Sequence, residues 1–338
     1  CNWRDFNSVY TLNRNVAGAG AEITMFSIAE LTGTEFSYNT EALAAGALML
    51  TNKASLVCRD CKLLHNTATF SGGAIYIDKL AKVELYDTLI KGNSADRASA
   101  LYFNYPSNSL LKNCTIIENH SSNQLTIEMQ NSYISITDSV LANNTSSQSA
   151  GVEVTDSTLE ITNCMFYNST SGVIGVLYVT SRSVVVMKKS MIRDIYGKIF
   201  MGVVGVLGTS NFTIEDSSIS NAEVMDTGAV YVDISSFLVV TRCTFSGITS
   251  VSEGSVLKVK SSTANIRGSF FNDNAVNAVD AYDSIVTIDD SSFKNNSGYD
   301  GGAISFVDSA RLNITNSQYL HNTADMRGGA VYISSAEE

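Results

Sequence analysis

The chain has 338 residues, a single proline, six cysteines and a formal net charge of −11 from 22 basic and 33 acidic residues. Because no basic cluster offsets this charge, we expect no nucleic-acid partner, whose phosphates an acidic surface would repel. No apolar run reaches the roughly 20 residues of a membrane-spanning helix, so the sequence predicts no membrane insertion by this segment.

The first twenty residues contain the only tryptophan, Trp3, and follow no repeat. Stacked strands leave an open edge at the first coil, and native proteins cover such edges. We therefore predict that residues 1–20 form an N-terminal cap or an inter-subunit segment, and that residues 21–338 form one repetitive domain. The chain starts at Cys1 and not at a methionine, which indicates a processed or partial product.

From residue 21 onward the sequence repeats with a period of 22 to 27 residues. Each repeat has a patch of small residues, an alternating strand, a polar turn, a second alternating strand and then an asparagine. The patch reads Gly-Gly-Ala at residues 72–74, 301–303 and 328–330. Periods of this length indicate stacked units that bury their apolar faces against one another.

The asparagine of each repeat marks the register of the stack. An Asn at the same turn of successive coils can hydrogen-bond to its neighbour and can tolerate a left-handed backbone. We predict a structural Asn ladder with Asp194 and Gly247 in two equivalent positions; its members are Asn39, Asn66, Asn93, Asn119, Asn144, Asn168, Asn221, Asn274, Asn296 and Asn322.

Alternating segments such as residues 81–86 and 211–215 indicate strands with one buried face. Helical periodicity is nearly absent, and the spacing of leucine-rich or ankyrin repeats does not occur. We therefore predict an all-β protein, a right-handed single-stranded parallel β-helix (solenoid) of about twelve coils. Pro106 is expected in a loop, because proline donates no ladder hydrogen bond. The expected interior residues are Ile75, Leu101, Leu125, Val152, Val230, Val256, Ile304 and Val331.

Four cysteines share one repeat position, where other repeats carry serine: Cys61, Cys114, Cys164 and Cys243. Ladder cysteines two coils apart are separated by roughly 9.6 Å, beyond the ~7 Å limit for a disulfide. We expect none of them to pair with another, and we interpret them as small buried residues interchangeable with serine. Cys58 and Cys61 form a lone CxxC motif, which is weak evidence for zinc or redox chemistry.

Enzymes with this fold need acids and bases gathered on one face. The candidate acidic group is Asp280, Asp283, Asp289 and Asp290, with Arg267 one repeat earlier. Aspartate at the turns of a parallel stack is ordinarily structural, and the three histidines, His65, His120 and His321, follow the repeat. We therefore predict no catalytic residue, no metal site and no cofactor.

Eight Asn-x-Ser/Thr sequons are present. In a secreted eukaryotic protein these are acceptors for N-linked glycans. Three of the sequon asparagines, Asn113, Asn211 and Asn313, are expected to face outward beside or within strands. Asn143 and Asn295 are further candidates, whereas ladder positions are expected to be occluded.

The segment Phe293-Lys294-Asn295-Asn296, followed by Gly301-Gly302-Ala303-Ile304, resembles the repeat of the chlamydial polymorphic membrane proteins and of similar β-helical surface proteins of protists. This resemblance implies an extracellular or cell-surface location.

We expect a non-enzymatic structural protein, a building block of a surface filament, coat or stalk. The chain ends in the middle of a coil, so the expected partners are copies of itself end to end or further β-helical chain. The alternatives are an adhesin-type surface β-helix and a polysaccharide lyase or glycoside hydrolase of the β-helix class.

Overall fold

The computed structural model describes residues 1–15, 18–105, 108–197, 200–308 and 311–334, so that Pro106 and Glu338 lie outside the described residues. It contains two compact units, Cys1–Ser171 (unit 1) and Gly172–Glu338 (unit 2). Throughout the described ranges the regular structure consists of strands, without a helix. Each unit is a parallel β-helix, and the two contain about twelve coils in all. The predicted fold class is confirmed.

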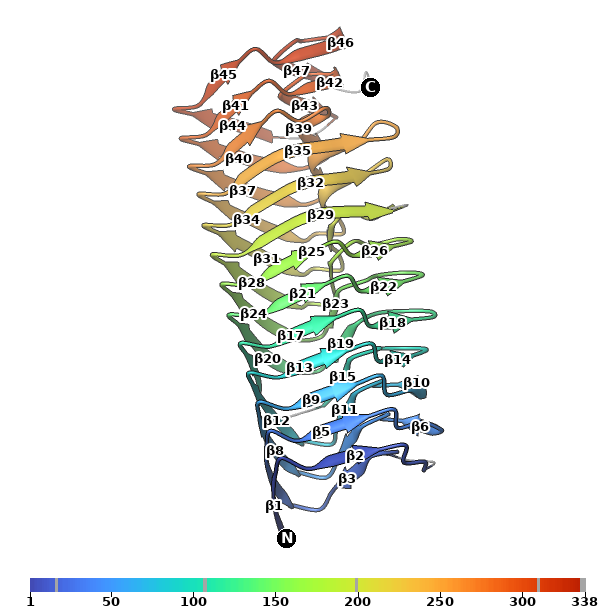
Figure 1. Ribbon diagram of the computed structural model, residues 1–338. Helices are drawn as coiled ribbons and strands as arrows, with labels where there is room; N and C mark the ends of the chain where they lie inside the picture. Colours follow the sequence, from blue (N-terminus) through green and yellow to red (C-terminus); the bar gives the residue numbers. More distant parts are fainter. Residues whose placement is uncertain (16–17, 106–107, 198–199, 309–310, 335–338) are drawn as a thin grey trace. The chain divides into compact units, whose positions relative to one another are not determined.

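Unit 1 winds through three sheets in the same order in each coil (Figure 1). Sheet A contains β1 (Asn2–Phe6), β4 (Ile28–Thr32), β8 (Ser55–Arg59), β12 (Lys82–Tyr86), β16 (Ser109–Lys112), β20 (Tyr133–Thr137) and β24 (Thr158–Thr162). Sheet B contains β2 (Val9–Thr11), β5 (Glu35–Ser37), β9 (Lys62–Leu64), β13 (Leu89–Lys91), β17 (Thr115–Ile117), β21 (Val140–Ala142) and β25 (Met165–Tyr167). Sheet C contains β3 (Ala21–Ile23), β7 (Leu48–Leu50), β11 (Ile75–Asp78), β15 (Leu101–Asn104), β19 (Ile127–Gln130) and β23 (Val152–Thr155). Short side strands lie between sheets B and C, at the right-hand edge of Figure 1: β6 (Ala42–Ala44), β10 (Ala68–Ser71), β14 (Ser94–Ala95), β18 (His120–Ser121), β22 (Thr145–Ser146) and β26 (Thr170–Ser171).

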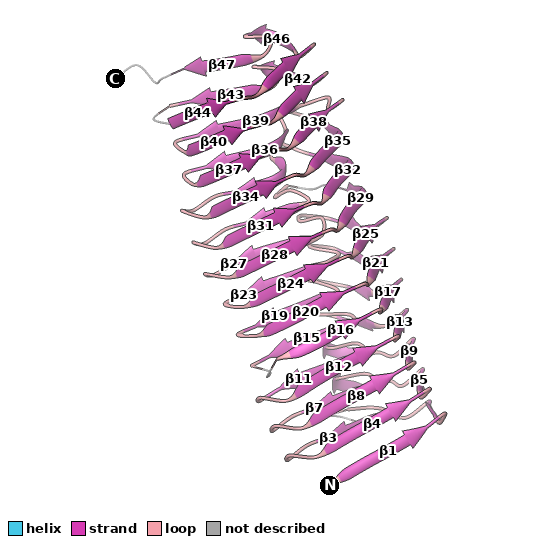
Figure 2. Cartoon of the chain, turned by 90° about the vertical axis from the view of Figure 1, so that its left-hand side faces the viewer, coloured by secondary structure: helices cyan, strands magenta, loops and turns pink. Residues whose placement is uncertain are grey.

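Unit 2 repeats this arrangement, and Figure 2 shows its strands running in parallel coil after coil. Sheet A contains β28 (Val184–Lys188), β31 (Asn211–Glu215), β34 (Phe237–Thr241), β37 (Thr263–Arg267), β40 (Ile285–Asp289) and β44 (Arg311–Thr315). Sheet B contains β29 (Met191–Gly197), β32 (Ser218–Val224), β35 (Thr244–Ser250), β38 (Phe270–Asn272), β41 (Ser292–Lys294) and β45 (Gln318–Leu320). Sheet C contains β27 (Leu177–Thr180), β30 (Val204–Val206), β33 (Gly228–Val232), β36 (Ser255–Lys260), β39 (Asn277–Tyr282), β43 (Ile304–Val307) and β47 (Val331–Ser334). Two side strands, β42 (Ser297–Asp300) and β46 (Thr323–Arg327), pair with each other.

Equivalent side chains of successive coils stack in columns. In unit 2 the rings of Phe245, Phe271, Phe293 and Tyr319 follow one another at 4.9, 4.9 and 5.0 Å between centroids. This spacing matches the distance between hydrogen-bonded strands, because each ring comes from the next strand of sheet B. Burial of such columns supplies the apolar core of each coil.

Seven of the eight predicted interior residues are buried, whereas Val331 on β47 is partly exposed, and two of the eight lie outside the columns that we expected. Ile75 stacks with Leu101, Ile127 and Val152, and Val230 stacks with Leu257, Val279, Ile304 and Val331. Leu125 lies two residues before its column, and Val256 lies one residue before. Both are still buried, because the small-residue corner also faces the interior.

The Gly-Gly-Ala patch forms the corner that precedes sheet C. Gly72 has a left-handed backbone with φ of 66°, and a Cβ atom on Gly73 would lie 2.1 Å from the carbonyl oxygen of Ser99 in the next coil. No side chain fits at that distance, so glycine is required where adjacent coils meet so closely.

Residues 1–15 follow the repeat, contrary to our expectation of a break. β1 pairs in register with β4, and β2 pairs with β5. The interior of this coil is unusual, because Trp3, Asp5 and Tyr10 lie beside core residues of the second coil. The hydroxyls of Ser8 and Tyr10 donate hydrogen bonds to the Asp5 carboxylate. The role of residues 1–20 as a cap stays a prediction.

Candidate functional site

The asparagine ladder of unit 1 is a buried column of amides. The Oδ1 atom of Asn66 accepts hydrogen bonds from the backbone N–H of Asn39 at 3.1 Å and from its Nδ2 at 2.8 Å. The Nδ2 atom of Asn66 donates to Oδ1 of Asn93 at 3.0 Å and to the carbonyl of Phe36 at 2.9 Å. Asn119 and Asn144 continue the same pattern, and Asn39 to Asn144 are fully buried.

The column begins one coil earlier than the sequence indicated. Asn13 donates from its backbone N–H and its Nδ2 to Oδ1 of Asn39, at 3.0 and 2.8 Å. The spacing of 26 residues to Asn39 is the signal that could have identified it.

Unit 2 contains a shorter ladder of three amides. Asn274 donates to Oδ1 of Asn296 at 2.8 Å, and Asn296 donates to Oδ1 of Asn322 at 3.0 Å. All three also donate to a backbone carbonyl of the preceding coil. In the three coils before Asn274, the ladder position holds Ile195, Ala222 and Ile248.

Two predicted members, Asn168 and Asn221, do not belong to the ladder. They lie one residue before the ladder position, are exposed, and have φ of 50° and 51°. Asp194 and Gly247 occupy the same left-handed position in other coils. We had expected the ladder asparagines themselves to be left-handed, but the left-handed residue is the one before each of them.

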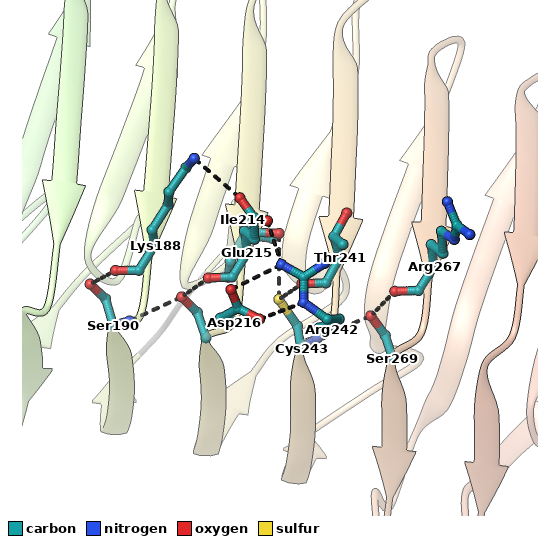
Figure 3. A network of polar contacts seen from close by, with 11 residues as sticks. Lys188, Ser190, Ile214, Glu215, Asp216, Thr241, Arg242, Cys243, Arg267 and Ser269 are labelled. Atoms are coloured by element: carbon teal, nitrogen blue, oxygen red, sulfur yellow. Dashed lines mark hydrogen bonds and ion pairs between the residues drawn. The ribbon is translucent and has the colours of Figure 1, made fainter.

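A second column, of serine and cysteine, follows the corner between sheets A and B (Figure 3). The Oγ of Ser217 accepts from the backbone N–H of Ser190 at 3.0 Å, and the Oγ of Ser269 accepts from that of Cys243 at 3.1 Å. The Cys243 thiol donates to the carbonyls of Ile214 and Thr241, at 3.4 and 3.3 Å. Cysteine and serine therefore act alike here, as expected.

The ladder cysteines do not pair with one another. Cys114, Cys164 and Cys243 are buried thiols, and burial raises the pKa of each to about 11. Cys61 instead forms a disulfide with Cys58, with a Cα–Cα distance of 6.0 Å. The CxxC motif is thus a local crosslink at the corner between β8 and β9.

The predicted acidic group does not converge. Asp289 lies at the end of β40, where it pairs with Arg267 at 3.6 Å and accepts from Thr315. Asp290 and Asp283 are left-handed residues at two different corners, whereas Asp280 points outward from β39 in sheet C. The described residues also contain no group of three His, Cys, Asp or Glu placed to hold a metal ion.

The histidines are placed by the repeat. His65 and His321 are left-handed corner residues, in unit 1 and unit 2 respectively. The His65 ring stacks on Tyr38 of the preceding coil at 5.1 Å, and His120 Nδ1 lies 2.9 Å from the Thr145 hydroxyl of the following coil. Each contact joins neighbouring coils.

The outer face of sheet C in unit 2 carries the group that best qualifies as a functional site. Tyr231, Lys258 and Asp280 lie side by side on β33, β36 and β39. The Lys258 ammonium is 3.3 Å from Asp280 and donates to the carbonyl of Asp226. The neighbouring hollow, the Lys258 hollow, is lined by Lys258, Val259, Lys260, Asp280, Tyr282 and Val307.

The two lysines at the Lys258 hollow each lie close to a carboxylate. Lys260 lies 4.0 Å from the Asp233 carboxylate, and the Tyr231 hydroxyl donates to the same carboxylate at 2.6 Å. Burial, together with this hydrogen bond, raises the pKa of Tyr231 well above its usual value, so the phenol stays protonated. No pattern along the chain marks this group, because its members lie on successive strands and come together only in the outward column.

Unit 1 has its own polar group on the outer face of sheet C. Tyr76 and Tyr102 stack at 5.0 Å, and Glu128 and Glu153 follow in the same outward row. Glu128 is fully buried beneath Arg97, which donates to both carboxylate oxygens, with Nε–Oε2 at 3.2 Å. Burial, and then the Glu128 charge, raise the pKa of Glu153 above its usual range.

The five glycosylation candidates are all exposed: Asn113, Asn143, Asn211, Asn295 and Asn313. Of the other sequons, Asn119 and Asn144 are buried in the ladder, whereas Asn168 is exposed. The described residues form no helix, and therefore none that is long and apolar enough to cross a membrane.

Comparison with known proteins identifies the fold. The family described as "right handed beta helix region" matches residues 14–186 and 150–319. No curated protein matches the chain by sequence.

Similar solved structures include the A-module of a mannuronan C-5 epimerase from Azotobacter vinelandii, with 12% identity, a TM-score of 0.50, and coverage of 92% of this chain and 91% of that one. A surface adhesin of Streptococcus pneumoniae has 10% identity and a TM-score of 0.43, with coverage of 92% and 87%. A PL6-family alginate lyase has 8% identity and a TM-score of 0.29, with coverage of 97% and 86%. At such low identity the similarity to the epimerase module shows the fold and not the activity.

Proposed function

The chain belongs to the right-handed β-helix family, and from that premise we propose that it is a non-enzymatic extracellular structural protein, a building block of a cell-surface filament, coat or stalk. One observation carries this proposal: the polar residues that recur from coil to coil form their hydrogen bonds within the stack itself. The ladder amides bond to one another, and the Ser and Cys side chains bond to backbone groups.

The acids and bases between these columns support the same proposal. Arg242 binds both Glu215 and Asp216, and Glu215 also pairs with Lys188 at 3.2 Å (Figure 3). Each of these ion pairs joins one coil to the next, so the charged side chains stabilise the contact between neighbouring coils. A catalytic pair, in contrast, requires groups with separated pKa values that share access to a substrate.

The partners in this proposal are copies of the chain stacked end to end, or further β-helical chain. A parallel coil binds the next one through backbone hydrogen bonds and matching columns, so a following coil needs no new type of contact. The adhesin-type alternative, like the resemblance to the chlamydial and protist surface proteins, stays a prediction.

Two measurements test the proposal. Antibodies against the chain should label intact cells of the source organism without permeabilisation, and immunogold electron microscopy should place the label on a regular filament, coat or stalk. Label confined to permeabilised cells would contradict the extracellular location. Label on intact cells in a diffuse, unassembled form would contradict the structural role.

A polysaccharide-acting enzyme is the second candidate, and the Lys258 hollow is the observation that favours it. Tyr231, Lys258 and Asp280 bring an acid, a base and a protonated phenol together within three consecutive coils. Groups of these kinds perform proton transfer at sugar carbons.

This candidate is tested by incubating the purified chain with neutral and uronate polysaccharides, while following new reducing ends, unsaturated products and C-5 epimerisation by NMR. We expect no turnover. Turnover that is lost in Lys258→Met and Asp280→Asn, but kept in Lys294→Met on the exposed side of β41, would establish the enzyme and overturn the structural proposal.

A further inference from the structure

We propose that Asn211 carries an N-linked glycan that covers an apolar patch on the outer face of sheet A in unit 2. The inference rests on the extracellular location in the proposed function, because N-glycosylation takes place in the secretory pathway. The structure shows which sequon asparagines have a side-chain amide free to carry a glycan, and the sequence motif alone does not.

Two sequons are incompatible with the folded ladder. The Nδ2 atom of Asn119 donates one hydrogen to Oδ1 of Asn144 and the other to the carbonyl of Ile90, both at 3.1 Å. A glycosidic bond would replace one of these hydrogens and would place a sugar in the core. Asn144 is fully buried as well and donates to the carbonyl of Ile116.

Four sequons lie at left-handed corners: Asn113, Asn143, Asn168 and Asn295. Asn113 donates to Asp87 of the preceding coil at 2.6 Å, and Asn295 donates to Asp273 at 2.7 Å. These amides contribute to contacts between coils, so a glycan would have to share them.

Asn211 differs because its sequon lies in an extended strand with its outer face in solvent. Asn211 is the first residue of β31 and is exposed, whereas Phe212 points into the core and is fully buried. Thr213 then returns to the outer face, because side chains alternate along a strand. Both recognised side chains of the sequon therefore face outward together.

The surroundings of Asn211 are apolar. Val184 and Phe237 flank Asn211 on the neighbouring strands, and Val186 and Val239 flank Thr213 in the same way. These four residues, the Val184 patch, are partly exposed, and Val184 is 37% exposed. Apolar surface of this kind promotes association unless it is covered.

A sugar attached to Asn211 would lie at the centre of the Val184 patch. Its carbon–hydrogen faces can pack on the valines and on the Phe237 ring, while its hydroxyls remain in water. The ion pairs of Lys188, Glu215 and Arg242 border the patch at the strand ends (Figure 3). The glycan would thus cover four clustered apolar side chains beside a charged strip.

Asn313 provides a matched comparison on the same sheet. It is also outward-facing within a strand, β44, and its sequon also ends in an outward threonine, Thr315. Its direct neighbour on β40, Thr287, is polar, and Arg311 precedes it on the outer face. The apolar surface near Asn313 is a single side chain, Ile285, which lies diagonally across on β40. A glycan on Asn313 would therefore cover much less apolar surface than one on Asn211.

A eukaryotic host is made to secrete the chain, and glycopeptide mass spectrometry then shows whether each sequon carries a glycan. We expect a glycan on Asn211 and none on Asn119 or Asn144. Because the host supplies the secretory pathway, this result is independent of where the native protein resides, which the antibody labelling above tests separately. An unmodified Asn211 would overturn the proposal.

Variants then test what the glycan does. Asn211→Gln and Thr213→Ala both remove the sequon, and light scattering should show more association than in the glycosylated parent, whereas Thr213→Ser keeps the sequon and should match the parent. Asn313→Gln should also match the parent, and adding Phe237→Thr to Asn211→Gln should restore the association state of the parent. If Asn211→Gln stays as monodisperse as the parent, or if the glycosylated parent itself dimerises through the Val184 patch, the covering role is wrong.

Discussion

The replacement Asn66→Ala is predicted to destabilise unit 1 by about 4 kcal/mol. The substitution removes four buried hydrogen bonds: two accepted by Asn66 Oδ1 from Asn39, one donated to Asn93, and one donated to Phe36. Each such bond contributes about 1 kcal/mol net, and more where a buried partner is left unsatisfied. The backbone N–H of Asn39 is one such partner, because Oδ1 of Asn66 is its hydrogen-bond acceptor.

The matched control is Asn168→Ala in the same unit. Asn168 is exposed and left-handed, so alanine there should cost only about 1 kcal/mol, because alanine lacks the short polar side chain that lets asparagine tolerate that conformation. Stacked coils need not unfold in a single step. Urea unfolding should therefore be combined with amide hydrogen exchange, in which Asn66→Ala should speed exchange at Asn39. Equal losses of stability in the two variants would refute the reasoning.

Three further predictions concern the thiols, the glycine corner and the Glu153 carboxyl. Alkylation of the folded protein at neutral pH should modify the exposed Cys1 but not the three buried thiols, Cys114, Cys164 and Cys243. The raised pKa of these three thiols keeps them protonated until the pH approaches about 11. Rapid labelling of all four cysteines, detected by peptide mass spectrometry, would contradict their burial. Gly73→Ala should reduce the thermal midpoint far more than Gly268→Ala, because its Cβ would meet a backbone oxygen at 2.1 Å, whereas that of Gly268 meets only a side-chain carbon of Arg242 at 3.5 Å. The pKa of Glu153 is raised in the folded state, so its proton is held to higher pH than in the unfolded chain and its contribution to stability falls as pH rises through that range. Glu153→Gln should flatten this part of the stability profile, and an unchanged pH dependence in urea titrations would refute the assignment.

The sequence could predict the fold because the repeat length and the alternation of apolar and polar residues both constrain the path of the backbone. Repeats of similar length indicate stacked units, and alternating strands bury one face, so a parallel β-helix followed from strands such as Ile75-Tyr76-Ile77 as much as from any motif. The pairing of residues 1–15 with the second coil could not be predicted from the sequence, because their inward residues are Trp3, Asp5 and Tyr10. The paired backbone is preserved there while the interior chemistry changes.

The ladder could be predicted only to within one residue. Two adjacent corner positions favour asparagine for different reasons, since one needs a left-handed backbone and the next needs a buried amide. Asn143 and Asn144 occupy both positions, so the sequence around Asn168 does not say which one a single asparagine fills. Register in space decides it, because Ser169 and not Asn168 follows Asn144 in the column.

The group at Tyr231, Lys258 and Asp280 is separated in sequence by about one coil at each step, so no local pattern marks it. It becomes visible only when strands are aligned and read across sheet C. The acidic group chosen from the sequence failed for the opposite reason. Asp280, Asp283 and Asp289 are close along the chain, but a strand and a corner turn their side chains to different sides of the coil.

Each amide in the unit 1 column both gives and receives in the same direction, from one turn of the spiral to the next. Each amide forms the same hydrogen bonds with the coil before it and the coil after it. A whole coil can therefore be duplicated or deleted, and the remaining amides can pair again without an unsatisfied polar group. Gene-level gain or loss of complete turns would therefore be tolerated where a change of a single residue is not, and relatives of different length should differ by integral turns.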